Sequence, residues 1–238
     1  MSQSLEGAVV LVTGANGGLG EEFVAQALSR GASKVYATAR TPRDWEDSRI
    51  VSLALDVTSP ESVAAAAAAA SDVTVVVNNA GVSNREENSL LTSPLEAVRA
   101  LFETNFFGAV QVVRAFAPVL GANGGGALID VHSALSWIGI SGVYSATKAA
   151  FWSATNSFRL ELAPQGTQVL GLHLGYTATP MTEGIDAPMG QASDVVRDAY
   201  DGLERGDHEV LADQTSIDVK AGLSGPIEAM YPGLPARV

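Results

Sequence analysis

The sequence has 238 residues, of which 47% are hydrophobic, and a formal net charge of −12. That length and apolar content predict one globular domain with a sizeable buried core, and the negative charge argues against nucleic acid or an anionic membrane as the main partner. The absence of cysteine excludes disulfides and thiolate metal sites.

The first ten residues, MSQSLEGAVV, have neither a basic region nor a long apolar stretch, so we expect no secretion signal. No uninterrupted apolar run approaches the length of a membrane span. The expected protein is therefore soluble and cytoplasmic, and binds neither nucleic acid nor membrane.

Short apolar runs alternate with longer helical patterns, which is typical of βαβ units and a parallel sheet. Most of these runs are continuously apolar, as expected when helices cover both faces of the sheet. The predicted fold class is α/β: one doubly wound, Rossmann-like domain over residues 1–238, with seven parallel strands and helices on both faces. The expected strands are Ala8–Val12, Lys34–Ala39, Ile50–Asp56, Val73–Val77, Ala127–Val131, Gln168–Leu174 and Glu209–Ala212.

Three helices are easily predicted between these strands. Ser59 offers an N-cap and Pro60 a first helical residue to an alanine-rich helix. The segments 93–120 and 144–163 are long and apolar on more than one face, so each needs a covering neighbour, within the chain or in another subunit. The Pro- and Gly-rich tail, residues 221–238, is expected to be loop.

Four glycines lie between Gly14 and Gly20 in the stretch VVLVTGANGGLGEEF, between a predicted strand and a predicted helix. A flexible turn is one explanation. Phosphate binding at the helix N-terminus is the better one, because side chains there would block the approach of the ligand. The loop has no lysine, so it is not the phosphate loop of a nucleoside triphosphatase.

Further motifs follow the later strands: NNAG from Asn78, Asn105 in FETNFFG, Ser133 in DVHSALS, and Tyr144 and Lys148 in YSATK. Together with TGANGGLG, they resemble the single-domain short-chain dehydrogenase/reductase family, of the NADP-preferring carbonyl reductase type. The resemblance spans about residues 5–215. It implies hydride transfer between NADP(H) and a ketone/alcohol pair.

Tyr144 and Lys148 lie four residues apart, on one face of a helix. A free tyrosine has a pKa of about 10, and lowering it to about 7 requires roughly 4 kcal/mol. The Lys148 ammonium and the charge of an oxidised nicotinamide both favour the phenolate. Tyr144 is thus the predicted acid/base, although a Tyr/Lys pair at this spacing also occurs by chance.

The resemblance implies that Ser133 holds the substrate carbonyl oxygen and that Asn105 supports a proton relay. Ser136 is a rival for the first role, and a buried structural asparagine is the alternative for the second. The chain departs from the family in three places: only ten residues separate Ser133 from Tyr144, Asp130 replaces an asparagine, and Leu174 replaces a proline.

The second predicted strand ends at Ala39 and Arg40, where NAD-binding relatives of this fold carry an acidic residue. A guanidinium suits the additional phosphate of NADP, so we expect NADP(H) to be preferred over NAD(H); a solvated surface arginine is the alternative. The predicted cofactor-binding residues are Gly14, Asn16, Gly18, Leu19, Gly20, Arg40, Asp56, Val57, Asn79, Ala80, Gly81, Tyr144, Lys148, Gly175, Thr177 and Thr179.

No histidine stands in metal-ligand spacing, so no metal is expected, and each histidine is interpreted as a core or surface residue. A short lid over about residues 179–193 and several apolar side chains flank the predicted cleft, where substrate lining and core packing are equally plausible. The histidines are His132, His173 and His208, and the flanking apolar residues are Trp137, Ile138, Val143, Met181 and Met189.

Two alternatives to an NADP-dependent reductase remain open. One is a dinucleotide-sensing regulator that kept the fold and lost the reaction; the other is different chemistry on the same scaffold, including an NAD-dependent alcohol dehydrogenase, an epimerase or a dehydratase. The complete Ser/Tyr/Lys/Asn set argues against the first alternative. The resemblance also implies a homotetramer, in which the helices carrying Asn105 and Tyr144 form the contacts.

Overall fold

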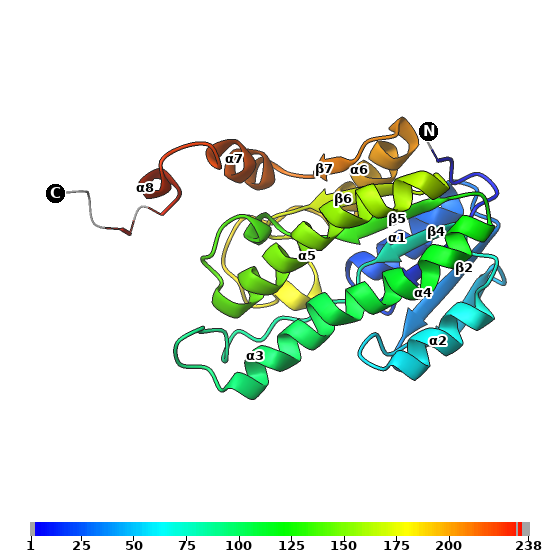
Figure 1. The fold of residues 1–238 in the computed structure, drawn as a ribbon, viewed down its shortest axis with the longest axis horizontal. Coiled ribbons are helices and arrows are strands. Elements are labelled where there is room, and N and C mark those ends of the chain that lie inside the picture. Colours follow the sequence, from blue (N-terminus) through cyan, green and yellow to red (C-terminus); the bar gives the residue numbers. More distant parts are fainter. Residues whose placement is uncertain (1–2, 232, 235–238) are drawn as a thin grey trace.

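The structure is a computed structural model that describes residues 3–231 and 233–234. Within this part of the chain, seven strands form one sheet in the order β3-β2-β1-β4-β5-β6-β7, and every neighbouring pair is parallel (Figure 1). The chain reverses its direction of winding between β1 and β4, which is where such sheets bind ligands. The strands are β1 Val9–Thr13, β2 Lys34–Ala39, β3 Ile50–Ala54, β4 Val75–Asn78, β5 Ala127–Val131, β6 Gln168–His173 and β7 Glu209–Leu211.

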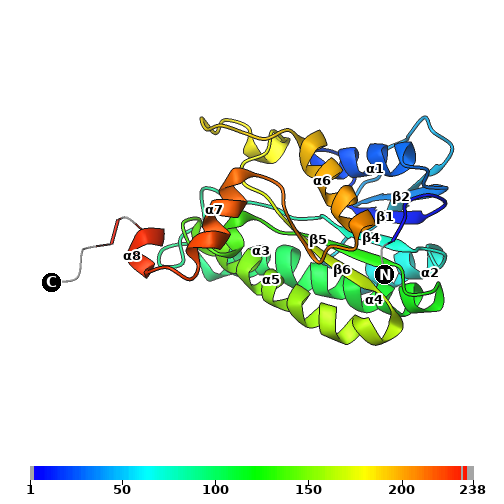
Figure 2. The same ribbon diagram turned by 90° about the horizontal axis from the view of Figure 1, so that it is seen from above.

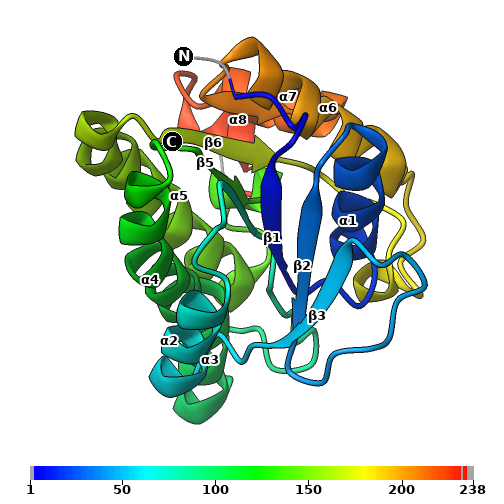
Figure 3. The same cartoon turned by 90° about the vertical axis from the view of Figure 1, so that its right-hand side faces the viewer.

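Helices cover both faces of this sheet, each with its own apolar core. Helices α1 and α6 lie on one face and α2, α4 and α5 on the other (Figure 3). Phe23 and Tyr200 anchor the first core with an edge-to-face contact, and Phe116 and Phe151 are buried in the second. The bounds are α1 Leu19–Ser29, α2 Pro60–Ala69, α3 Leu95–Phe102, α4 Ala109–Ala122, α5 Gly142–Leu162, α6 Ala192–Arg205, α7 Gln214–Gly222 and α8 Ile227–Met230.

The predicted doubly wound sheet is confirmed, with strand ends displaced by at most two residues. The third strand was expected to reach Asp56 but ends at Ala54. Asp56 instead accepts hydrogen bonds from the backbone and hydroxyl of Thr58, at 2.9 and 2.7 Å, which turn the chain toward α2. As an edge strand, β3 is also partly exposed, unlike the buried strands beside it.

The segment 93–120, predicted as one helix, is divided by a π-helical turn. Helix α3 leads into that turn, Glu103–Gly108, and α4 follows it. By length and composition alone, Leu95–Ala122 could span a membrane, but core helices of globular domains pass the same test. Here Val112 and Phe116 of α4 are buried against the sheet.

Helix α7 lies mainly before the predicted loop at residues 221–238, and a short helix, α8, lies within that predicted loop. Helix α7 begins after Asp213, whose carboxylate accepts a 2.7 Å hydrogen bond from the Ser216 amide as an N-cap. A further short helix, α8, follows. Figures 1 and 2 show both helices extending beyond the sheet, at the end of the molecule where α5 begins. Part of the predicted tail, residues 232 and 235–238, lies outside the described residues.

Candidate active site

The glycine loop forms a concave backbone surface at the carboxyl end of β1. Gly14 and Gly18 have φ angles of +68° and +57°, which other residues rarely adopt. A Cβ atom at Gly20 would collide with the Gly14 carbonyl oxygen. No side chain caps α1, which begins at Leu19. No side chain therefore blocks the approach of a phosphate to this helix end, although the Gly20 amide donates to the Gly17 carbonyl oxygen at 3.2 Å.

Asn79 joins this loop to the carboxyl end of β4. Its side-chain amide donates to the carbonyl oxygens of Thr13, at 2.9 Å, and Gly14, at 3.3 Å. The backbone amides of Asn79 and Ala80 both donate to the Thr13 hydroxyl at 2.9 Å. Asn79, one of the predicted cofactor-binding residues, therefore holds the two loops together.

Arg40 and Asp56 come together at the ends of β2 and β3, where the arginine helps to hold the pKa of Asp56 below its ordinary value, after the Thr58 hydrogen bonds. Arg43, the second arginine of this region, is engaged elsewhere. It forms a 2.7 Å ion pair with Glu21 and lies 3.9 Å from the Trp45 ring centroid. Among the described residues Arg40 makes no ion pair and its side chain is exposed.

Two other predicted cofactor residues are held by local contacts. The Asn16 side chain donates a 2.8 Å hydrogen bond to the Thr41 carbonyl oxygen, which joins the glycine loop to the segment after β2. Val57 is buried, and a Cβ atom at Gly108 would come 2.8 Å from its side chain. Val57 therefore packs closely under the π-helical turn.

Three of the four predicted catalytic residues, Asn105, Tyr144 and Lys148, lie near one another beside the ends of β4 and β5. Lys148 donates a 2.9 Å hydrogen bond from Nζ to the Val131 carbonyl oxygen and lies 5.8 Å from the Tyr144 ring centroid. A Cβ atom at Gly81 would lie 3.4 Å from Asn105 Oδ1 and 3.7 Å from Lys148 Nζ. Gly81 thus leaves the space between Asn105 and Lys148 open.

Asn105 lies within the π-helical turn and is buried. Its Oδ1 accepts from the Val82 amide at 2.8 Å, and its Nδ2 donates to the Val82 carbonyl at 2.9 Å and to the Thr147 hydroxyl at 3.2 Å. These bonds tie the segment after β4 to the helix that carries Tyr144. The observed contacts are those of the structural asparagine considered as an alternative, and they also place its side chain beside Lys148.

Ser133 and its rival Ser136 both lie in the turn that follows β5. The Ser133 hydroxyl accepts from the Leu135 amide at 3.1 Å, while the Ser136 hydroxyl accepts from the Ser133 amide at 3.4 Å. Ser136 therefore caps the turn from within and supports Ser133. His132 alone separates Ser133 from the end of β5 at Val131.

Burial dominates the electrostatics of this region. It raises the pKa of Tyr144 to about 12 and lowers that of Lys148 to about 8, partly offset by the charge of Asp130. The expectation that Lys148 favours the Tyr144 phenolate is not visible among the protein groups alone, because desolvation of the phenol is the larger effect. Any lowering of this pKa requires a further positive charge in the cleft.

Asp130, which departs from the family, is buried on β5 behind Lys148. Thr155 donates a 2.6 Å hydrogen bond to its Oδ2, and the Asn78 side-chain amide donates at 3.3 Å to its Oδ1. Burial raises the pKa of Asp130 to about 7, against the effect of these bonds and of Arg159 and Lys148. The carboxyl is therefore largely protonated in mildly acidic solution.

Two histidines are buried near β5 and β6, which agrees with their interpretation from the sequence as core residues. His173 on β6 lies with Nδ1 3.3 Å from the Ser133 carbonyl oxygen, and Trp137 stacks on its ring at 3.9 Å between centroids. Burial lowers the pKa of His173 to about 3, so the ring is neutral and can donate to Ser133. His132 is buried against Phe151. The support of Ser133 by His173 was not predicted.

After β6, the chain meets the glycine loop again. The Gly175 amide donates to the Asp213 carboxylate, and a Cβ atom at Gly18 would lie 3.3 Å from Thr179 Cβ. Thr177 is buried, and its hydroxyl has no hydrogen-bond partner among the described residues. An unpartnered buried hydroxyl beside a glycine cradle fits a bound dinucleotide.

The segment after Thr179 forms an open groove of about 410 Å³. Backbone pairing of Thr177 with Gly190 closes its base, and Arg85, from the loop after β4, donates to the carbonyl oxygens of Met181 and Glu183 at 2.7 and 2.9 Å. The groove is lined by Ala178, Thr179, Pro180, Thr182, Glu183, Gly184, Ile185 and Met189.

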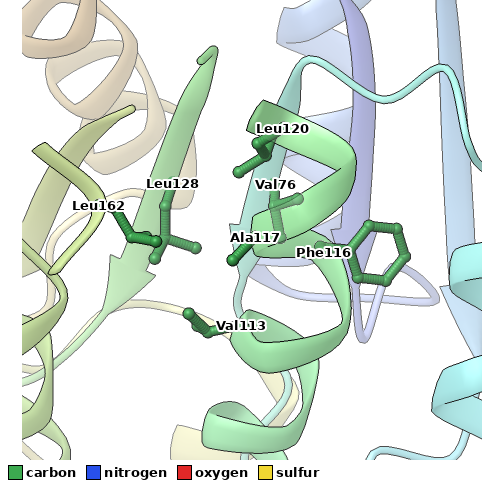
Figure 4. Close-up of a pocket in the computed structure, with 7 residues that line it drawn as sticks. All are labelled: Val76, Val113, Phe116, Ala117, Leu120, Leu128 and Leu162. Atoms are coloured by element: carbon green, nitrogen blue, oxygen red, sulfur yellow. The ribbon is translucent and has the colours of Figure 1, made fainter. Parts of the chain in front are cut away.

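Other candidate pockets do not reach this chemistry. An apolar gap between α4, β4, β5 and Leu162 has no room for a water molecule (Figure 4). Among the predicted pocket residues, Trp137 and Val143 are buried, whereas Met181 is 42% exposed beside the groove. No cluster of metal-ligating side chains occurs in the described part of the chain.

Comparisons with known proteins agree with this geometry. A family model described as short chain dehydrogenase matches residues 8–190. The 1-deoxy-11-beta-hydroxypentalenate dehydrogenase of Streptomyces exfoliatus is 33% identical over 212 residues, which cover 83% of this chain and 77% of the relative. A 3-oxoacyl-[acyl-carrier-protein] reductase of Vibrio cholerae is 31% identical over 195 residues, covering 77% of this chain and 79% of the relative.

Among solved structures, a short chain dehydrogenase of Burkholderia cenocepacia in complex with NADP superposes with a TM-score of 0.90. It is 35% identical, and the match covers 97% of this chain and 98% of that one. A Burkholderia phymatum structure of the same fold, in complex with NAD, gives a TM-score of 0.83 at 21% identity, covering 99% and 100% of the two chains.

Proposed function

This chain belongs to the short-chain dehydrogenase family, and on that premise we propose that it is an NADP(H)-dependent oxidoreductase acting on a ketone/secondary alcohol pair. The observation that carries the proposal is the position of buried Lys148, whose Nζ lies beside Gly81 near Asn105 and 5.8 Å from the Tyr144 ring centroid. Ser133 follows the neighbouring strand. A sensor would need the glycine loop but not a buried lysine beside a tyrosine.

Each residue has a distinct role in the proposed reaction. When bound, the nicotinamide supplies or accepts the hydride. Ser133 and the Tyr144 hydroxyl hold the substrate oxygen, and Tyr144 donates a proton to it as charge develops there. Lys148 holds the nicotinamide ribose, and its ammonium favours the Tyr144 phenolate only together with the positive charge of the bound oxidised nicotinamide. Asn105 keeps the segment after β4 close to Lys148.

We assign the preference for NADP(H) to Arg40. Its guanidinium is exposed at the end of β2, while Glu21 and Trp45 already engage Arg43. Ala39 offers no carboxylate that would repel a phosphate. The Burkholderia cenocepacia structure in complex with NADP supports this proposal. We propose that the other residues predicted from the sequence to bind the cofactor also contact it.

The small-molecule substrate reaches Tyr144 beside the lid, residues 179–193, whose groove is mainly apolar. We propose a compact carbonyl substrate.

We also propose a cytoplasmic homotetramer assembled on α4 and α5. Phe107 is 47% exposed beside α4 and Leu160 is 79% exposed on α5, and apolar side chains in such positions are typical of subunit contacts. Light scattering at micromolar concentration tests this assembly, which a monomeric mass would disprove.

The proposed function is tested by NADPH oxidation against a panel of aryl ketones, diketones and acyl thioesters, with NADH in parallel. Turnover of at least one ketone with NADPH is expected. Dinucleotide binding with no turnover of any panel member would favour the sensor. A higher kcat/KM with NADH would favour an NAD-dependent enzyme, and product formation without net NADPH oxidation would indicate epimerase or dehydratase chemistry.

A further inference from the structure

The segment that carries Ser133 is short and receives support from the far end of the chain. Residues 133–141 join β5 to α5, and beyond the turn Ala134–Ser136 they have no regular structure. At their apex, Gly139 donates a 2.9 Å backbone hydrogen bond to the Tyr231 hydroxyl. Ile140 beside it is 67% exposed. This apex therefore depends on a contact with a residue more than ninety positions later.

A second contact reaches the same segment through Trp137. The Lys220 ammonium of α7 lies 5.6 Å from the Trp137 ring centroid and forms an ion pair with Glu209 at the start of β7. Trp137 is held between this cation and the ring of His173, on which it stacks at an interplanar angle of 15°. An ammonium near the face of an indole is attracted by the ring.

His173 links this stack to Ser133 itself. Its Nδ1 faces the Ser133 carbonyl oxygen at 3.3 Å and its Nε2 lies 3.7 Å from the Glu209 carboxylate. Lys220 is thus connected to Ser133 through the stacked rings of Trp137 and His173. Asp213, at the base of α7, also binds the Gly175 amide on the cofactor side.

We propose that residues 213–231, the C-terminal arm, form part of the substrate site, and that Lys220 and Tyr231 are positioning residues. They hold the segment 133–141 in the position in which Ser133 and the Trp137 side chain face the substrate. The part of this inference that concerns substrate rests on the proposed function. The part that concerns the order of the segment stands on the contacts alone.

The two variants Tyr231→Phe and Lys220→Met test the proposal with little risk to folding. Tyr231 lies outside both apolar cores, and Lys220 is partly exposed. Hydrogen–deuterium exchange should become faster in residues 133–141 of each variant. KM for the ketone should rise about 2- to 10-fold, which is the factor expected for one hydrogen bond or comparable contact, while KM for NADPH stays unchanged.

The chain offers a matched control at the opposite end of the sheet. Lys34 pairs with Asp72 at 2.5 Å and lies 5.1 Å from the Tyr36 ring centroid, and the Tyr36 hydroxyl donates to Asp72 at 2.9 Å. Lys34→Met and Tyr36→Phe therefore remove the same kinds of contact far from the site. They should leave the ketone KM and exchange in 133–141 unchanged.

Three results would overturn the proposal: unchanged exchange in 133–141, faster exchange without a rise in the ketone KM, or an equal rise in KM for NADPH. If the wild-type protein reduces no ketone, the proposed function fails, and exchange alone then decides whether the arm orders the segment. Circular dichroism of each variant confirms that the fold is retained.

Discussion

The two halves of the sheet contribute different kinds of groups to the candidate site. On the side of β1, β2 and β3, the candidate site consists mostly of backbone: positive φ angles at Gly14 and Gly18, an uncapped helix and an exposed Arg40. On the side of β4, β5 and β6, it consists of buried polar side chains. These buried side chains include Asn78, Asn105, Asp130, His132, Lys148, Thr155 and His173.

Each half therefore contributes a different property to the candidate site. The glycine side provides shape, since backbone at Gly14, Gly18 and Gly20 forms its loop, and one positive charge, that of Arg40. The catalytic side provides altered pKa values, since removal from water disfavours charge on Tyr144, Lys148 and Asp130 in turn. Changes on the first side should therefore alter dinucleotide binding, and changes on the second should alter turnover and the pH dependence of stability.

The largest effect is expected from Tyr144→Phe. Only the hydroxyl is lost, and the proposed proton transfer needs it in the transition state, so kcat should fall by ~10²–10⁴-fold. NADPH affinity, measured by fluorescence titration, should change little. Retention of more than about a tenth of the wild-type kcat would remove Tyr144 from the role of acid/base.

Asp130→Asn should stabilise the protein in a pH-dependent way. The carboxyl has a pKa of about 7 when folded and an ordinary value of 3.8. Folded protein therefore holds this proton while unfolded protein releases it, and the contribution of Asp130 to stability falls as pH rises from 4 to 7. Asparagine does not titrate, so its advantage should grow over this window to at most about 4 kcal/mol at pH 8.

Urea midpoints at pH 4, 6 and 8 measure this advantage for wild type and variant. The buried Thr155→Val variant serves as a control, because it removes the 2.6 Å hydrogen bond but leaves the carboxyl to titrate. An advantage of Asp130→Asn that is equal at all three pH values would show that Asp130 keeps an ordinary pKa.

Arg40→Ala should raise KM for NADPH by ~10–100-fold, because a charge-assisted bond to phosphate contributes about 1.5–3 kcal/mol. KM for NADH should stay nearly constant. The double change Ala39→Asp with Arg40→Ala should reverse the preference, by repulsion as well as by lost attraction. Arg99→Ala, an exposed arginine on α3, is the control. A wild-type preference for NADH, or equal weakening of both cofactors by Arg40→Ala, would show that Arg40 does not bind the phosphate.

Local patterns predicted the sheet, the glycine loop and the Tyr144–Lys148 pair, because periodicity and spacing over a few residues determine them. The supports of these groups could not be predicted. His173 contacts Ser133 forty positions earlier, and Arg85 contacts the lid almost a hundred positions later. Such contacts depend on how distant segments pack, and a lone buried histidine or an exposed arginine carries no local signal of its partner.

The π-helical turn at Glu103–Gly108 makes the length of this helix as important as its composition. A π turn corresponds to one extra residue within an α-helix, and removing one residue from an α-helix rotates the residues before the deletion by about 100° relative to those after it. Deleting one residue inside the turn, other than Asn105, would therefore remove the extra residue and restore a regular α-helix, with buried Leu101 of α3 still facing the core. A single-codon deletion inside α4 has no extra residue to remove, so it should rotate α3 relative to α4 and be tolerated less well than a deletion inside the turn.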